Sequence, residues 1–115
     1  MDKRDLKNLW KQPHSSTCFL IDFDAAQVVA GPTNDIHFLI VAGEKPWVTM
    51  NASLQPRIYL DKPDYWQIEV VGRQSGVGLP TTGPYSISID LSASRGRKGV
   101  EVVGAVKTQR IDIAG

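Results

Sequence analysis

The sequence has few of the features that place a protein outside the cytoplasm. Its single cysteine, Cys18, rules out a disulfide within the chain, which suits a reducing compartment. The first 30 residues are charged and lack the basic and then apolar pattern of a secretory signal. The longest apolar run, 38–42, is far shorter than the ~20 residues that span a bilayer. We therefore expect a cytoplasmic protein with no membrane segment.

The chain also lacks an excess of charge of either sign. Thirteen Lys and Arg against twelve Asp and Glu leave a net charge of +1 at pH 7. No overall field therefore draws the protein to nucleic acid or to an anionic membrane. Nucleic-acid binding is disfavoured on this ground.

Residues that carry metal binding and nucleophilic catalysis are scarce. The chain has two histidines, and no spacing of His, Cys, Asp or Glu matches a known metal motif. Cys18 stands in the run CFLIDF, where a lone cysteine is typical of a small buried hydrophobe. We expect no metal, no cofactor and no assigned catalytic residue.

What the sequence does contain is an ordinary globular composition in one domain, 1–115. At 115 residues with 42% hydrophobic residues, the chain can bury a sizeable core. Residues 2–12 form the only segment with helical periodicity, ended by Pro13. Its stripe of Leu6, Leu9 and Trp10 predicts a short amphipathic helix that packs on the sheet, or else an arm that binds a partner.

The remainder of the chain is patterned as strands. Residues 83–91 and 65–72 alternate apolar and polar side chains, with Trp66 and Tyr85 on the inward faces. Residues 36–42 are apolar on both faces, which predicts a central strand covered on two sides. Further strands are predicted near 17–23, 26–30, 47–52, 57–60, 100–107 and 111–113. Strand starts about every ten residues predict an all-β fold, an antiparallel or mixed β-sandwich or open barrel with one short N-terminal helix.

The run VEVVGAV, 100–106, is apolar on both faces. Since the edge of a monomeric sheet does not expose two apolar faces, we expect this run to be central or buried in a homodimer.

The connection 72–84, GRQSGVGLPTTGP, is the most distinctive stretch. It matches neither the P-loop nor the dinucleotide pattern, because a strand rather than a helix follows it. A loop of this length predicts an ordered lip of a cleft or interface, in which Arg73, Thr81 and Thr82 contact what binds. The alternative is a packed corner without a partner.

Within this connection, Pro80-Thr81-Thr82-Gly83 precedes the aromatic Tyr85, and Lys45-Pro46-Trp47 lies earlier in the chain. These motifs resemble the Pro-Thr-Thr-Gly and Arg-Pro-Trp loops of the chagasin-like cysteine peptidase inhibitors, although the family carries them in the opposite order. The resemblance implies an inhibitor of papain-like peptidases.

Two further groups are candidate contacts with a partner. Tyr59 and Tyr65 have outward parity and could stack on a sugar or a protein. Arg95 and Arg97 lie in a hairpin loop, 92–99, where they could contact phosphates or an acidic partner, or could simply be solvated.

Taken together, these features predict a non-enzymatic binding module for an unknown protein or small molecule, with self-association as a homodimer. One alternative is the peptidase inhibitor. The other is a small hydrolase or lyase that uses Asp22, Asp35 and His37.

Overall fold

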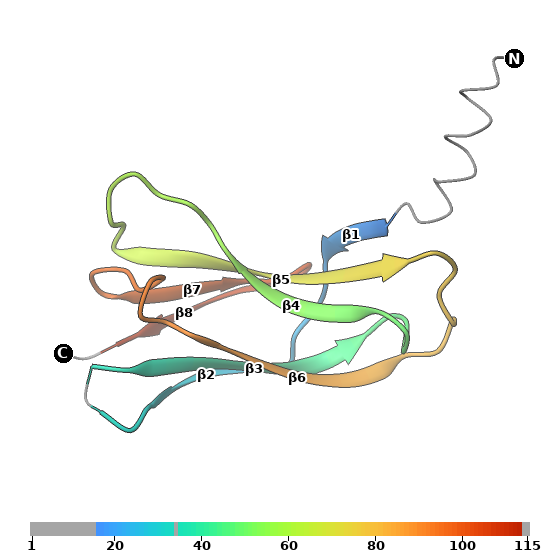
Figure 1. The fold of residues 1–115 in the computed structure, drawn as a ribbon, viewed down its shortest axis with the longest axis horizontal. Helices are drawn as coiled ribbons and strands as arrows, with labels where there is room; N and C mark the ends of the chain where they lie inside the picture. The colour runs from blue at the N-terminus through green and yellow to red at the C-terminus, as the bar shows by residue number, and fades with distance from the viewer. Residues whose placement is uncertain (1–15, 34, 114–115) are drawn as a thin grey trace, which may run out of the picture.

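The computed structural model describes residues 16–33 and 35–113, and these residues form two β-sheets (Figure 1). The helix predicted over 2–12 lies outside the described residues. The strands are β1 (Ser16–Leu20), β2 (Ala25–Ala30), β3 (His37–Lys45), β4 (Asn51–Pro56), β5 (Tyr65–Ser75), β6 (Gly83–Asp90), β7 (Gly99–Val103) and β8 (Thr108–Asp112). The all-β class predicted from strand spacing is therefore confirmed.

The smaller sheet has the order β2-β3-β6 and is antiparallel throughout. The larger sheet is built around β5. One side of β5 pairs with β4 over residues 68–73, and the other side pairs with β7 over 65–69 and with β1 over 71–75. Because the β5–β7 pair is parallel and the other pairs are antiparallel, this sheet is mixed. The two sheets pack together, as a sandwich requires (Figure 1).

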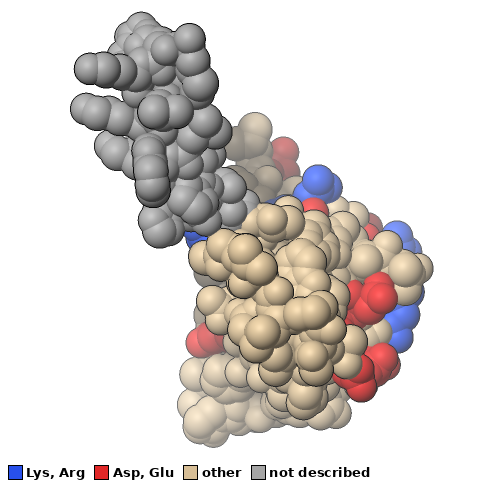
Figure 2. Space-filling model, turned by 90° about the vertical axis from the view of Figure 1, so that its right-hand side faces the viewer, with Lys and Arg blue, Asp and Glu red and all other residues tan. Residues whose placement is uncertain are grey.

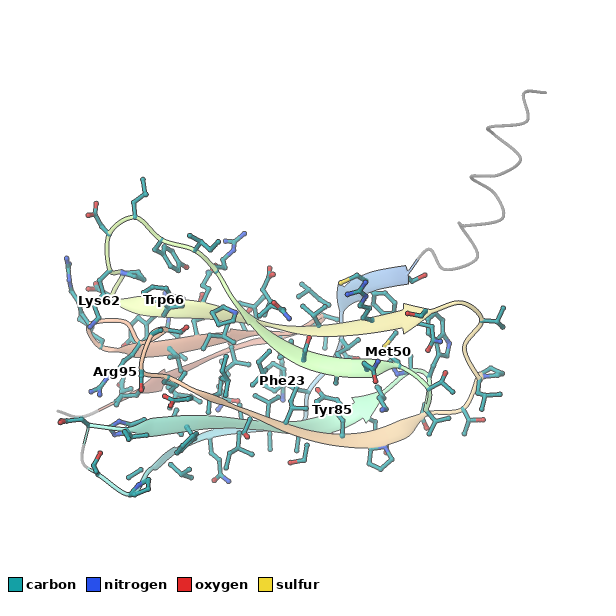
Figure 3. The ribbon with its side chains drawn as sticks, viewed as in Figure 1. Phe23, Met50, Lys62, Trp66, Tyr85 and Arg95 are labelled. Carbon is teal, nitrogen blue, oxygen red and sulfur yellow. The ribbon has the colours of Figure 1, made fainter. Side chains whose placement is uncertain are left out.

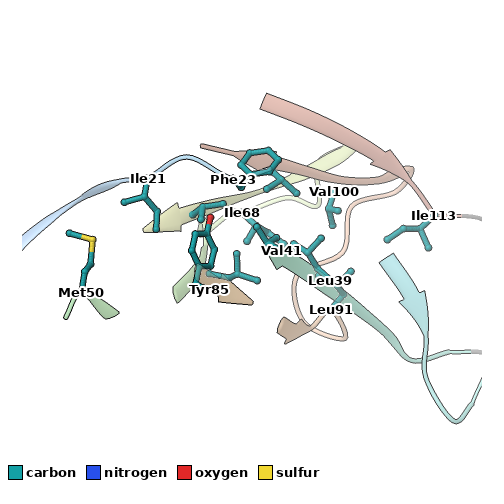
Figure 4. Packing of buried hydrophobic residues seen from close by; sticks show 13 residues of the cluster. Ile21, Phe23, Leu39, Val41, Met50, Ile68, Tyr85, Leu91, Val100 and Ile113 are labelled. Atoms are coloured by element: carbon teal, nitrogen blue, oxygen red, sulfur yellow. The ribbon is translucent and has the colours of Figure 1, made fainter. Parts of the chain in front are cut away.

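The core lies between the sheets and combines inward residues of the strands with residues of connections, such as Ile21, Phe23 and Met50 (Figure 4). Tyr85 and Leu91 from the alternating segment 83–91 are buried, and so are Ile68 and Val70 from the segment 65–72. The intervening Ser86, Ser88 and Asp90 are exposed. Period-two patterning therefore identified the inward faces of β5 and β6 correctly.

The strand β3 is central, between β2 and β6, as its apolar sequence predicts. Its two faces differ, however. Leu39 and Val41 are fully buried, whereas Phe38 and Ile40 are only half-buried. The expectation of cover on two sides is therefore wrong, because no third layer of the described residues packs on this sheet.

The run 100–106 forms β7 and the turn that follows it. Val100 and Val102 are fully buried, and β7 lies between β5 and β8. Of the two expectations for this run, the central position is the one observed. Val106, in the turn, is 79% exposed, and the homodimer stays a prediction.

Several strand boundaries differ from expectation. The strand predicted near 47–52 is displaced, because residues 46–50 form a connection and β4 begins at Asn51. The segment 57–60 is a connection in which Ile58 is 96% exposed, so its aliphatic residues do not pack as a strand. The strand β5 continues to Ser75 through Gly72, where an added Cβ would lie 2.3 Å from Met50 Sδ. The side chains of Met50 and Ile21 pack against Gly72, and a residue without a side chain adds nothing to a periodic pattern.

Candidate functional site

The connection between β5 and β6 spans residues 76–82, which is shorter than the predicted 72–84. It begins at Gly76, the one described residue that has a positive φ, at 70°. Residues 72–75 belong to β5 and residues 83–84 to β6.

This connection is held against residues 46–49, which join β3 to β4. The amide of Val48 donates a 2.6 Å hydrogen bond to the carbonyl oxygen of Thr81. The amide of Leu79 donates to the hydroxyl of Thr49 at 3.2 Å. The Trp47 ring lies so close to Gly78 that an added Cβ would stand 3.0 Å from it. Residues 46–49 and 76–82 thus form one structural unit, which we call the paired loops.

A buried polar contact ties the paired loops to β5. Gln74 is 4% exposed, and its Oε1 accepts a 2.9 Å hydrogen bond from Thr49 Oγ1. Its Nε2 donates to the carbonyl of Ser75 at 2.9 Å. The Thr49 hydroxyl therefore links Gln74 in the sheet to the Leu79 amide in the loop. This link restricts the loop, because moving Thr49 away would leave the buried Gln74 amide without its partner at a cost in free energy.

The paired loops present apolar side chains to solvent. Val77 is 97% exposed, Leu79 57% and Val48 43%. Phe19 of β1 continues this surface and meets the Trp47 ring edge-on at 5.9 Å. Neither 46–56 nor 74–89 contains a charged residue. Figure 2 looks onto this end of the molecule and shows uncharged residues across its middle, with charged ones at the margins.

A shallow hollow of about 400 Å³ adjoins the paired loops. Thr82 lines it beside Pro46, and charged groups from Asp22, Glu44 and Lys45 border it. Of the predicted contact residues, Thr81 and Thr82 therefore lie at this end of the sandwich.

Arg73 lies elsewhere. It is an exposed residue of β5, in register with Cys18 on one neighbouring strand and Asn51 on the other. These three residues line a trough on the outer face of the larger sheet. Arg73 and Thr81 therefore do not share one lip. Cys18 is exposed, so the expectation of a buried hydrophobe is wrong, because β1 directs this side chain away from the core.

The two tyrosines predicted as partner contacts are half-buried and engaged within the chain. The Tyr59 ring meets Trp66 edge-on at 5.0 Å. The Tyr65 hydroxyl donates to Asp112, and the Arg110 guanidinium lies 4.8 Å from the Tyr65 ring. The hydrogen bond to Asp112 raises the pKa of Tyr65 above its usual value.

Arg95 and Arg97 line a polar cavity at the end of the sandwich opposite the paired loops, together with Asp35 and His37. Asp22 does not join them. Its carbonyl accepts from the Tyr85 hydroxyl, and Tyr85 pairs with Gly43, six residues along β3 from His37. Six strand residues correspond to about 20 Å. The structure therefore does not assemble the three residues of the hydrolase alternative.

Within 16–33 and 35–113, no group of three or more His, Cys, Asp or Glu is placed to hold a metal ion. The same ranges contain no helix long and apolar enough to cross a membrane. Three further residues contribute to the two ends and were not predicted as site residues: Lys62, Thr49 and Gln74. The uncharged runs 46–56 and 74–89 are a further sequence signal that marks the paired loops.

Comparison of the chain with models of known protein families, with curated proteins and with solved structures found no match.

Proposed function

We propose that this protein is a non-enzymatic binding module that recognises another protein through the paired loops. The observation that carries the proposal is the 2.6 Å hydrogen bond from Val48 to Thr81, which holds two loops together beneath exposed Val77 and Leu79. Exposed apolar side chains on a fixed backbone are typical of binding surfaces.

Preorganisation of the paired loops strengthens binding. Burying a Val or Leu side chain stabilises a complex by about 1.5–3 kcal/mol, and ordering a mobile loop offsets part of that gain. The hydrogen bonds to Thr81 and Thr49 fix the loop before a partner arrives. Proline at positions 46 and 80 reduces backbone freedom further. The uncharged surface suits an apolar recess on a partner protein better than a charged ligand.

The test compares two matched double variants as bait for binding partners. V77D/L79D places two carboxylates on the paired loops, and I58D/L60D places two on a distant connection whose aliphatic side chains are as exposed. We expect V77D/L79D to weaken binding of the specific partner by at least about tenfold, since the complex would bury unpaired carboxylates. We expect I58D/L60D to bind the partner as the wild type does. Equal capture by the wild type and V77D/L79D would overturn the proposal, and so would equal loss by both variants.

The partner could also be a second copy of this chain, as the predicted homodimer requires. Native mass measurement of the wild type and V77D/L79D at high micromolar concentration distinguishes this case. A dimer that dissociates only in V77D/L79D identifies the paired loops as a self-association surface.

A second candidate function is inhibition of a papain-like cysteine peptidase. It is favoured by the position of the two motifs that resemble the chagasin-like loops. Lys45 pairs with Gly83, and the Trp47 ring packs on Gly78. Both motifs therefore lie side by side, although Leu79 follows Trp47 by 32 positions in the sequence. Inhibition of papain that is lost in W47A supports this function. No inhibition at about 100 µM chain excludes it while leaving the binding module to be tested on its own.

A further inference from the structure

The polar cavity at the end opposite the paired loops is formed by three connections that are distant in the sequence. Asp35 comes from the β2–β3 connection and His37 is the first residue of β3. Lys62 comes from the β4–β5 connection, and Ser92, Arg95 and Arg97 come from the β6–β7 connection. Figure 3 shows Lys62 and Arg95 at this end of the molecule. The volume of the cavity is about 340 Å³, at the small end of the range for small-molecule sites.

Backbone hydrogen bonds fix the two cationic connections to each other. The amide of Arg97 donates to the Pro63 carbonyl at 2.8 Å, and the amide of Lys98 donates to the Asp64 carbonyl at 2.7 Å. Gly96 sits between them so tightly that an added Cβ would stand 2.4 Å from the Asp64 carbonyl oxygen. The main chain therefore fixes the backbone of residues 97–98 against that of residues 63–64. A larger residue at position 96 would separate these two segments.

The charges that result are unbalanced. Lys62, Arg95 and Arg97 line the cavity against one lining carboxylate, Asp35. Two carboxylates of the flanking segments have partners of their own. Asp64 lies 4.0 Å from the ammonium of Lys98, and Asp90 accepts hydrogen bonds from the amide and the hydroxyl of Ser92. Lys62 and Arg97 carry like charge on two sides of the hollow, and an anion bound between them would offset their mutual repulsion.

His37 adds a further polar group to the wall. Its Nδ1 lies 3.4 Å from Nη1 of Arg95. A guanidinium only donates hydrogen bonds, so Nδ1 is the acceptor, and in the neutral ring the proton is carried on Nε2. The wall of the cavity is thus rich in donors, which is the chemistry that oxyanions require.

We propose that this cavity is a binding site for a small phosphate-bearing molecule, with Lys62 and Arg97 as the cations that contact the phosphoryl oxygens. Both side chains are exposed and reach the cavity from opposite connections, so one dianionic group can bridge them. The volume suits a phosphate monoester or inorganic phosphate and is too small for a dinucleotide.

The experiment is a titration of the full-length chain, followed by the backbone amide signals of 62–64 and 92–98 in two-dimensional NMR. The probes are inorganic phosphate, glycerol 3-phosphate and sodium chloride, at constant ionic strength. We expect saturable shifts with a dissociation constant on the order of 1 mM or lower for a phosphate probe. Tighter binding of glycerol 3-phosphate identifies an organic phosphate as the ligand, and equal or tighter binding of inorganic phosphate identifies the free ion.

Three charge-matched variants decide the outcome. K62Q and R97Q each remove an exposed cation of the cavity, and we expect each to weaken binding about tenfold. K107Q removes an exposed cation from the β7–β8 turn, one strand length away, and we expect a change below about twofold. Unsaturated shifts at about 20 mM, equal shifts with chloride, or unchanged binding in both K62Q and R97Q would overturn the proposal.

Discussion

The amide of Val48 and the carbonyl of Thr81 form a hydrogen bond of 2.6 Å that joins two connections of the sandwich. This contact predicts slow hydrogen exchange at a loop position. The Val48 amide is expected to exchange at least about 100-fold more slowly than the Val77 amide, for which the described residues provide no backbone acceptor. Native-state exchange measured by NMR checks this. Equal rates at the two amides would mean that the paired loops open independently.

The second prediction concerns the side-chain link between the loop and β5. T49V removes the hydroxyl that donates to Gln74 and accepts from Leu79, and it leaves the buried Gln74 Oε1 without that partner. We expect the free energy of unfolding to fall by about 1–3 kcal/mol in urea denaturation. T49S keeps the hydroxyl and should recover most of this loss. If both variants are equally destabilised, the effect comes from packing and not from the hydrogen bonds.

The third prediction concerns alkaline pH. Burial raises the pKa of Tyr85 to about 12 from its usual value of 10, with Asp24 and Asp22 adding to the effect. Between these two values the unfolded chain has lost the phenolic proton that the folded chain retains, so stability falls as pH rises from 10 to 12.

A shift of two pKa units corresponds to about 2.7 kcal/mol, and screening by solvent makes the expected loss smaller. Absorbance titration should show Tyr85 as a late-titrating tyrosine, and Y85F should remove both that step and the corresponding drop in melting temperature. A drop of the same size in Y85F would assign it to other groups.

The fourth prediction tests the close approach of β7 and β8. A Cβ on Gly99 would stand 1.9 Å from the carbonyl oxygen of Ile111, a backbone atom that cannot move aside alone. We expect G99A to destabilise the fold by about 3 kcal/mol or more, as overpacking beside backbone does. Ser86 is exposed on the outer face of β6, so S86A serves as the control and should change stability by less than about 0.5 kcal/mol. A stable G99A would show that the two strands can separate there.

Side-chain alternation was sufficient to predict the inward faces of β5 and β6, because one face of each strand packs on the core. It failed at 57–60, where Ile58 and Leu60 alternate with Tyr59 but project into solvent. The same criterion missed the continuation of β5 past Gly72, since Gln74 is a polar residue that is buried through its hydrogen bonds. Alternation of apolar and polar residues therefore predicts a strand only where apolar side chains make up its buried face.

The composition of the two ends could not be predicted, because residues far apart in the sequence form each of them. The paired loops bring residue 48 to residue 81, and the polar cavity brings residue 62 to residue 97. The sequence identified Thr81, Thr82, Arg95 and Arg97 individually from turn chemistry and charge. Their neighbours Thr49 and Lys62 follow only from the packing of the sheets.

Photo-crosslinking from position 77 is the most direct test of the binding surface. The chain carries p-benzoylphenylalanine in place of Val77 or, as the matched control, in place of Ile58, which is equally exposed. We predict that the probe at position 77 forms one discrete adduct, either with a partner protein or with a second copy of the chain. The probe at position 58 is expected to form no adduct of the same mass. Adducts that are the same from both positions, or none from position 77 under conditions in which the partner is captured, would contradict the assignment of the paired loops as the binding surface.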